Sequence, residues 1–581
     1  MLINKLEKDI KNIIEGLGIG VDDVSVNESN MHNPGDYQYN GCMKLASQNK
    51  KNPKELAEKI ANKLSENDSY QNITVTGPGF INISFTDQVL IDFINGVKND
   101  FTKNTYNVNN KTVFLDYGGA NIAKELHVGH MRSANIGEAF KRLLNACGYK
   151  TISDVHLGDY GKPMGLVMLE IKKRKPDLVY FDENYTGEYP TESPVTAEEL
   201  AEIYPVASIK SKEDKNYLEE ARKLTLDLQQ KKPGIYALWQ HIRNVSIENI
   251  RETYDLLNTS FDLWEGESDA GEYVDELLNY LEKNNYLQNS EGAKVIFVNE
   301  KTDKKEVPPM LLVKSNGGVL YDTTELATIY SRMKRFKIDE MWYLTDNRQS
   351  LHFLQTFRAV KKTKIVPENM ILNHLPFGTI NGKDGKPFKT RDGDVMSLNT
   401  LYNQIYDECY KKVSSISDEE EKKQLAKIIA ISALKFSDLL PNRETDYIFD
   451  PVKFSDLNGK TGPYILYNTV RIKSIFKKIN SDIENYKKYN KISTSAERKI
   501  ILHLLKLPYT LKRAIEIKEI SELTEYVYKL TNLYSSFYND NYILSEKDTS
   551  KKESWIVLSD IILKTNIFIL NILGIEIPNK M

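Results

Sequence analysis

A short turn between a strand-like run and a helical run constrains the fold of this chain most. The turn reads His127-Val128-Gly129-His130. Residues 112–117 before it are apolar and strand-like, and residues 131–147 after it place apolar side chains on one helical face. Residues 151–156 then resume a strand. A strand, a helix and a second strand in this order form the building unit of a parallel, doubly wound sheet.

The chemistry of this turn suits a nucleotide phosphate. Gly129 lets the backbone approach a ligand closely, and the free N–H groups at the start of a helix favour anionic oxygens. The imidazoles of His127 and His130 can donate hydrogen bonds to phosphate oxygens as these gain charge in a transition state. Four residues are a short motif, so two histidines that only cap a helix remain the alternative at this point.

A second candidate for phosphate binding lies far downstream, at residues 382–391. The segment carries Lys383, Lys386 and Lys389 between glycines on a presumed loop. Lysines placed in this way can neutralise charge on a transferring phosphoryl group, although a solvated basic loop would have the same composition. Loops at the carboxyl ends of parallel strands meet where the two halves of a doubly wound sheet converge. We therefore expect the two loops to act on one nucleotide.

Together the two loops resemble a known pair of signatures. A His-x-Gly-His motif followed far downstream by Lys-x-x-Lys-Ser/Thr marks the class I aminoacyl-tRNA synthetases. The longer strings at residues 121–133 and 385–391 are similar to arginyl-tRNA synthetases of the bacterial type in particular. Further blocks that resemble this family lie along the rest of the chain, at residues 35–38, 77–82, 459–467, 530–538 and 573–578.

The resemblance implies an α/β fold built around a Rossmann-like, doubly wound parallel-sheet catalytic domain with an inserted helical segment. A small α/β N-terminal add-on domain and an all-α C-terminal anticodon-binding domain complete it. We place the tRNA-contacting add-on domain at residues 1–105, the catalytic domain at 106–397 with its insertion at about 176–294, a helical connector at 398–455 and the anticodon-binding domain at 456–581.

Patterns along the chain agree with this division. Residues 98–111 are polar, Asn-rich and aperiodic, as in a linker, and residues 176–294 are charged and helical. Strand-like runs return at residues 295–298, 311–314 and 341–344, and we assign all three to the sheet domain.

The resemblance also implies a reaction. The carboxylate of L-arginine attacks the α-phosphate of ATP and displaces pyrophosphate, and the arginyl group then passes to the 3′ end of tRNA(Arg). The expected catalytic residues are His127, His130, Lys386 and Lys389. The further residues expected to bind ATP are Lys124, Gly129 and Lys383. Mg²⁺ is expected to arrive with ATP, held by phosphates and water, so we expect no metal held by the protein itself.

Recognition of arginine requires a different partner, because a carboxylate matches the planar guanidinium best. The family has a Tyr-x-x-x-Asp pattern on a helix, and Tyr321 and Glu325 match it here, with glutamate where aspartate is usual. Glu325 could instead be a surface charge of that helix. Asn121 and Gln349 are also expected to contact the amino acid.

Contacts to tRNA are expected in the last domain. Aromatic side chains between residues 526 and 538 recur at partly helical spacing, and Tyr538 could stack on an anticodon base. Such a stripe is more often part of a core. Arg471 lies in a basic cluster that could follow the phosphate backbone.

Composition excludes several other classes. The 581 residues carry a net charge of −3, so the chain is not a generally basic nucleic-acid-binding protein. Its 3 cysteines are far apart and form no zinc or disulfide pattern. We find no uninterrupted apolar run of about 18 residues and no signal peptide. We therefore expect a cytoplasmic protein with no membrane partner, and a monomer, because no heptad seam is present.

Two other classes of function remain open from the sequence alone. One is a non-catalytic, tRNA-binding relative that kept the fold, although the phosphate-binding residues are intact. The other is a small-molecule nucleotidyltransferase with the same histidine motif, although such enzymes are shorter and have no use for the terminal domains.

Overall fold

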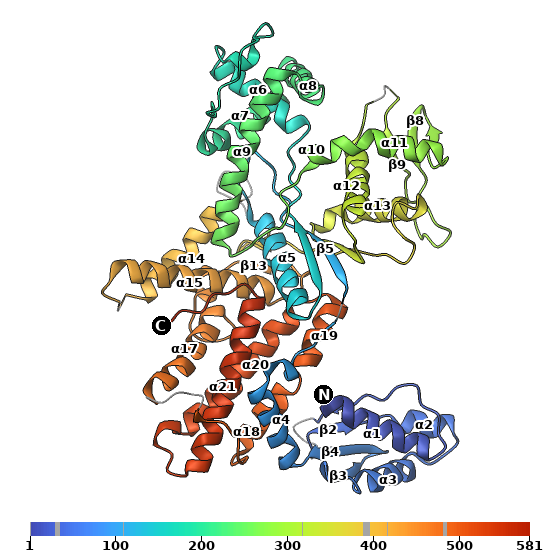
Figure 1. The fold of residues 1–581 in the computed structure, drawn as a ribbon, viewed down its shortest axis with the longest axis vertical. Helices are drawn as coiled ribbons and strands as arrows, with labels where there is room; N and C mark the ends of the chain where they lie inside the picture. Colours follow the sequence, from blue (N-terminus) through green and yellow to red (C-terminus); the bar gives the residue numbers. More distant parts are fainter. Residues whose placement is uncertain are drawn as a thin grey trace.

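The computed structural model describes residues 2–29, 35–108, 110–315, 318–386, 396–414, 416–479 and 485–581. Figure 1 shows a small N-terminal unit at one end of the molecule and a helical projection at the other. The central sheet and the C-terminal helices lie between them.

The N-terminal unit is an antiparallel sheet with helices packed on it. The strand order is β1 (Asn27–Glu28), β2 (Tyr37–Tyr39), β4 (Phe80–Phe85) and β3 (Tyr70–Thr76). Its helices are α1 (Leu2–Gly16), α2 (Cys42–Gln48) and α3 (Pro53–Leu64), and α4 (Asp87–Asn99) leads out of it. Helix α1 buries Leu6, Ile10 and Ile14, which recur every four residues on one face.

The central sheet is parallel throughout, in the order β11 (Ile371–His374), β10 (Glu340–Tyr343), β5 (Thr112–Asp116) and β6 (Lys150–Asp154). Helix α5 (Val128–Ala146) connects β5 to β6, and α13 (Ser350–Lys362) connects β10 to β11. Val113, Phe114 and Leu115 of β5 are fully buried, as expected for a strand covered on both faces. This sheet confirms the predicted strand, helix, strand unit.

The segment between β6 and β10 consists of two structures, of which the sequence predicted one. Its helical part forms the projection of Figure 1 and comprises α6 (Lys162–Arg174), α7 (Ala197–Glu213), α8 (Lys215–Gln229) and α9 (Pro233–Leu256). Next come the helices α10 (Glu267–Ala270) and α11 (Val274–Lys283), a small sheet of β7 (Gln288–Ser290), β8 (Ala293–Ile296) and β9 (Met310–Val313), and helix α12 (Tyr321–Arg335).

The runs at residues 295–298 and 311–314 fall on strands, as predicted, but these strands do not belong to the central sheet. Strands β8 and β9 pair antiparallel with each other, in a sheet of their own with β7. Only the third run, which forms β10, joins the parallel sheet. Short apolar runs predict that a strand is present but carry no information on its partner, so the separate sheet could not be predicted from them.

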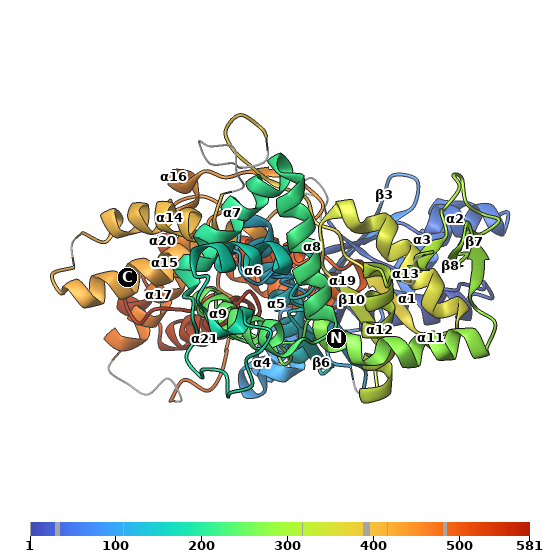
Figure 2. The ribbon, with the colours of Figure 1, turned by 90° about the horizontal axis from the view of Figure 1, so that it is seen from above.

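The rest of the chain is mostly helical. At its start, strand β12 (Ile380–Asn381) pairs in parallel with β13 (Tyr447–Ile448). The helices are α14 (Leu398–Lys412), α15 (Glu419–Leu439), α16 (Pro451–Phe454), α17 (Gly462–Lys478), α18 (Ser495–Leu504), α19 (Leu507–Ile517), α20 (Ser521–Asp540) and α21 (Thr549–Ile572). Figures 1 and 2 both place α14, α15 and α17 on the side opposite the N-terminal unit and β7 to β9.

Helix α21 is long and apolar enough to cross a membrane by length and composition, with a mean hydropathy of 1.6 over its best window. However, 78% of that window is buried inside the protein. Trp555, Ile561 and Leu570 are among its buried side chains, and α21 packs against α17, α20 and α5. It is therefore a core helix of the C-terminal body.

Candidate functional site

The histidine turn forms the start of helix α5. His127 is the N-cap residue, and its Nδ1 accepts a hydrogen bond from the N–H of Gly129 at 3.1 Å. Nδ1 of His130 accepts a hydrogen bond from the N–H of His127 at 3.0 Å. The two rings stack with their centroids 3.8 Å apart. The helix-capping role, considered as the alternative, is thus present, and it fixes both rings in place.

These contacts also set the protonation of the two imidazoles. Because backbone N–H groups donate to both Nδ1 atoms, each neutral ring carries its proton on Nε2. Burial and the nearby Lys124 lower the pKa of His127, and burial, His127 and Lys124 hold the pKa of His130 well below its usual range. Both rings are therefore neutral Nε2–H donors near pH 7, which suits a site for anionic oxygens.

The downstream basic loop returns to this turn. The N–H of Leu398 donates to the carbonyl of Leu126 at 2.8 Å, and the N–H of Val128 donates to the carbonyl of Met396 at 3.3 Å. These bonds flank His127, which pairs with Ser397 in a bridge. The segment that leaves the loop is therefore joined directly to the histidine turn.

Only some of the lysines of that loop lie in the described part of the structure. Lys383 and Lys386 are exposed, and Lys383 Nζ lies 4.0 Å from Asp450 Oδ2. Lys389 lies outside the described residues. The loop leaves β12, and the N–H of Gly382 donates to the carbonyl of Lys386 at 2.8 Å, which makes a tight turn before the part that is not described.

The other residues expected at the nucleotide, and Asn121, which is expected to contact the amino acid, have further contacts. A Cβ added to Gly129 would lie 3.0 Å from the His127 ring, so the capping contact itself favours glycine here. Lys124 Nζ lies 4.2 Å above the ring of Tyr204 from the helical projection. Asn121 pairs with Gly158 in a backbone bridge between the ends of β5 and β6.

The other residues expected to bind arginine, apart from Asn121, lie on α12 and on the turn before α13. Glu325 is only 3% exposed, so it is not a surface charge of its helix. The side chain of Tyr321 lies outside the described part of the structure. Gln349 ends the short turn η4 (Asn347–Gln349) and is exposed.

His352 of α13 connects two carboxylates of α12. Its Nδ1 lies 3.3 Å from Asp322 Oδ1, and its Nε2 lies 3.8 Å from Glu325 Oε2. Burial opposes the charged imidazole, but these two carboxylates outweigh it and raise the pKa of His352 to about 9. Burial likewise opposes ionisation of Glu325, and His352 and His156 outweigh it, so that the pKa of Glu325 is lowered. The carboxylate that a guanidinium would need is therefore ionised.

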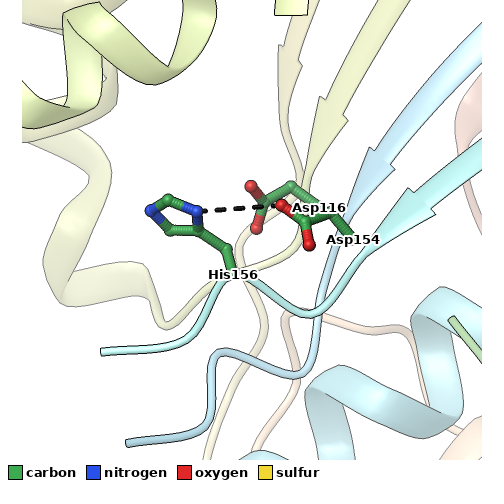
Figure 3. A group of neighbouring side chains, drawn as sticks. All are labelled: Asp116, Asp154 and His156. Atoms are coloured by element: carbon green, nitrogen blue, oxygen red, sulfur yellow. Dashed lines mark ion pairs between the residues drawn. The ribbon is translucent and has the colours of Figure 1, made fainter. Parts of the chain in front are cut away.

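A buried ionic cluster beside Glu325 was missed by the sequence analysis. Asp116 ends β5, Asp154 ends β6, and His156 follows, with Nδ1 3.8 Å from Asp154 Oδ2 (Figure 3). Arg332 of α12 donates from Nη2 to both aspartates at 2.7 Å. The available signal was a carboxylate at the carboxyl end of β5 and another at the end of β6, where α/β sheets hold their ligands.

Asp116, Asp154 and His156 have the donor atoms for a cation, with all three within 4.8 Å of one another. The positive charge at this place is already supplied by the guanidinium of Arg332, which contacts both carboxylates. A metal ion bound by the same oxygens would meet that guanidinium, so the donor set fits an ion pair better than a metal site.

The residues suggested for tRNA lie together on the C-terminal body. The guanidinium of Arg471 on α17 lies 4.1 Å above the ring of Tyr538 on α20, and both side chains are partly exposed. Tyr526, Tyr534 and Phe537 of the same stripe are at most 4% exposed. Most of the aromatic stripe thus belongs to the core, which was the alternative considered from the sequence. Tyr538 lies at the edge of the stripe.

Comparison with known proteins covers the whole chain. Residues 94–451 match the family described as "tRNA synthetases class I (R), catalytic domain". Residues 4–85 match "Arginyl tRNA synthetase N terminal domain", and residues 465–581 match "DALR anticodon binding domain". A curated protein of Francisella tularensis subsp. novicida (strain U112), named arginine--tRNA ligase, is 43% identical over 585 residues and covers 100% of this chain and 99% of its own.

The chain belongs to the arginyl-tRNA synthetases of class I. A second arginine--tRNA ligase, from Alkaliphilus oremlandii (strain OhILAs), is 41% identical over 587 residues and spans 100% of both chains. The family, the fold class and the ligase activity that the motifs predicted are therefore confirmed.

Solved arginyl-tRNA synthetases share this fold at lower identity. That of Plasmodium falciparum has a TM-score of 0.83 and 24% identity, and covers 100% of this chain and 99% of its own. That of Thermus thermophilus has a TM-score of 0.77 and 19% identity, with 100% of both chains covered. The fold thus persists where most side chains differ.

Proposed function

We propose that this arginyl-tRNA synthetase activates L-arginine at a single site, in which the histidine turn and the downstream lysine loop act on the same ATP. The observation that supports this most is the pair of backbone hydrogen bonds on either side of His127, which join residues 126–128 to residues 396–398. These bonds hold the segment that follows the lysine loop beside the histidine turn, and nucleotides bind at the carboxyl side of the sheet in folds of this type.

In the first step a carboxylate oxygen of arginine attacks the α-phosphorus of ATP. A bond forms between that oxygen and phosphorus, the bond to the bridging oxygen of the β-phosphate breaks, and pyrophosphate leaves. The Nε2–H groups of His127 and His130 donate to phosphate oxygens that gain charge, and Lys386 and Lys389 neutralise the leaving pyrophosphate. Lys124, Gly129 and Lys383 bind the same nucleotide. Mg²⁺ enters as part of the ATP substrate, held by phosphate oxygens and water.

The guanidinium of the substrate binds Glu325. A carboxylate accepts two parallel hydrogen bonds from this group, which Lys or other amino acids cannot donate in the same geometry. Tyr321, Asn121 and Gln349 complete the pocket, with Asn121 toward the α-ammonium or carboxylate. Asn121 and the histidine turn belong to one continuous segment, which brings the amino acid and the phosphates together.

In the second step the arginyl group passes from the adenylate to the terminal ribose of tRNA(Arg). The C-terminal domain, residues 456–581, binds the anticodon arm, with Tyr538 and Arg471 at the contact. The N-terminal domain, residues 1–105, is a further tRNA contact, and residues 106–397 and 398–455 form the catalytic domain and the connector. The protein acts as a cytoplasmic monomer, and activation requires bound tRNA.

The test is aminoacylation of total tRNA with a panel of amino acids. We expect arginine alone to be attached, with release of AMP and pyrophosphate. Attachment of a different amino acid, or of none, would overturn the proposal. Pyrophosphate exchange at full rate without tRNA would contradict only the proposed requirement for bound tRNA, and would leave the rest of the proposal intact.

A further inference from the structure

Arg332 is a fully buried cation on the helix that carries Glu325. Its side chain is 0% exposed, and Nη2 donates to Asp116 Oδ2 and Asp154 Oδ2, each at 2.7 Å. Nη1 donates to the hydroxyl of Tyr343 at 3.3 Å, and the guanidinium carbon lies 4.3 Å above the ring of Phe114. One side chain of α12 is thereby tied to the ends of β5, β6 and β10.

The same helix carries Glu325. Glu325 and Arg332 are seven positions apart, which is close to two helical turns and places them on one face. Both are buried, at 3% and 0% exposure. Because Arg332 is held by two short ion pairs, the register and rotation of α12 against the sheet are fixed, and with them the position of the Glu325 carboxylate.

The charges of this region also depend on Arg332. Three buried carboxylates, those of Asp116, Asp154 and Glu325, lie at one edge of the sheet and repel one another unless cations are close. Arg332 is the cation that contacts two of them directly. Removal of one partner of such a group leaves uncompensated buried charge, which is costly.

We propose that Arg332 is a positioning residue of the arginine pocket, whose guanidinium clamps Asp116 and Asp154 and thereby sets where Glu325 meets the substrate. This inference rests on the role of Glu325 proposed above. Arg332 does not touch the reacting atoms. It acts through α12, so its loss affects the binding of arginine more than the binding of ATP.

The test compares Arg332→Lys with the wild-type enzyme in the charging assay. Lysine keeps the charge but lacks the planar fork that reaches both aspartates. We expect the KM for arginine to rise about tenfold or more and the KM for ATP to change by less than about twofold, because small misplacement of a binding group has large effects. Arg358→Lys is the matched control, since Arg358 of α13 pairs with Asp303 through two nitrogens and lies outside the pocket.

Chemical rescue provides a second test of the role of Arg332. Arg332→Ala removes the guanidinium, and methylguanidinium at a few millimolar, well below denaturing concentration, should lower the KM for arginine again and raise the melting temperature of this variant. If Arg332→Ala does not fold, Asp154→Asn, which weakens the same clamp, should raise the KM for arginine selectively.

Three results would overturn the inference. The first is a KM for arginine in Arg332→Lys that equals that of the wild type. The second is an equal rise of the KM for arginine and the KM for ATP, in proportion to a fall in melting temperature, and the third is the same selective effect in Arg358→Lys. Glu325→Gln is measured alongside. If it leaves the KM for arginine unchanged while the wild-type enzyme charges arginine, the proposed role of Glu325 fails, and this outcome is distinct from a failure of Arg332 alone.

Discussion

At the scale of single residues, His127 and His130 each have two roles that use different nitrogens. Nδ1 accepts a backbone N–H in both residues, and Nε2 carries the proton. A substitution that keeps an acceptor at the place of Nδ1 but has no donor at Nε2 therefore separates helix capping from phosphate binding.

His130→Asn is such a substitution. Its amide oxygen can accept the N–H of His127, but no donor reaches as far as Nε2. We expect kcat to fall about a hundredfold, as for loss of a donor to developing charge, with a melting temperature close to that of the wild type. An unchanged kcat in single-turnover measurements would leave His130 with its capping role only.

Glu325→Gln removes the proposed anion of the arginine pocket without a change of shape. We expect the KM for arginine to rise at least about thirtyfold, since loss of one partner of a buried charge pair costs about 2–5 kcal/mol. Steady-state charging measures this directly. Glu170→Gln is the control, because Glu170 is equally buried but pairs with Lys210 and Arg174 in the projection. If Glu325→Gln behaves like this control, Glu325 does not bind the guanidinium of the substrate.

How far the sequence predicted the site depends on how local each contact is. The histidine turn was predictable, because its two hydrogen bonds join residues two and three positions apart. The clamp of Arg332 was not, because Arg332 and Asp116 are separated by 216 positions and no periodic pattern connects them. For the same reason the burial of Glu325 became visible only with the fold.

At the scale of elements, the site depends on how the loops after β5 and β6 meet. The N–H of Gly158 donates to the carbonyl of Ala120 at 2.9 Å, and the N–H of Ile122 donates to the carbonyl of Gly158 at 3.2 Å. A Cβ at position 158 would lie 2.2 Å from Oδ1 of Asn121, so a larger residue here would push the Asn121 side chain away. The sequence showed both loops, but their contact required the structure.

Gly158→Ala is therefore expected to displace the side chain of Asn121. We predict a rise of about five- to tenfold in the KM for arginine with little change in the KM for ATP. Gly96→Ala in α4, where an added Cβ meets no atom within 4 Å, should instead stabilise its helix by about 0.5–1 kcal/mol and leave both constants unchanged. Equal behaviour of the two variants in charging would contradict the proposed contact of Asn121.

The contact of α12 with α13 predicts a dependence on alkaline pH. His352 faces Asp322 and Glu325 with its pKa raised to about 9. Burial opposes the charge of His156, but Asp154 and Asp116 outweigh it and raise its pKa to about 10, with Arg332 as the opposing cation. Unfolded histidine has a pKa of about 6.5, so the stabilisation is complete below that pH and is lost as the pH rises through about 9 to 10.

Thermal melting between pH 7 and pH 10.5 measures this effect. Other groups also titrate in this range, so the comparison is with His352→Gln. The variant should be less stable than the wild type at pH 7, and the difference should shrink between pH 8 and pH 10. A difference that stays constant, or grows, would show that His352 is not held in its charged form by α12.

At the scale of the whole molecule, ion pairs connect parts that are far apart in sequence. Arg498 of α18 pairs with Asp36 and Asp87 of the N-terminal unit, and Lys98 of α4 pairs with Asp560 of α21. The order of parts along the chain was predictable from composition and motifs. These junctions were not, because they join single side chains hundreds of positions apart. They hold the N-terminal unit and the C-terminal body against one another.

The central claim is that the histidine turn and the lysine loop act on one ATP, and a crystal structure with L-arginine and a non-hydrolysable ATP analogue tests it most directly. We predict phosphate oxygens about 3 Å from Nε2 of His127 or His130 and within about 4 Å of the ammonium of Lys386 or Lys389, with the guanidinium of the substrate at Glu325. The account would be contradicted by nucleotide bound away from the histidine turn, or by Lys386 and Lys389 both lying far from the phosphates of the bound nucleotide.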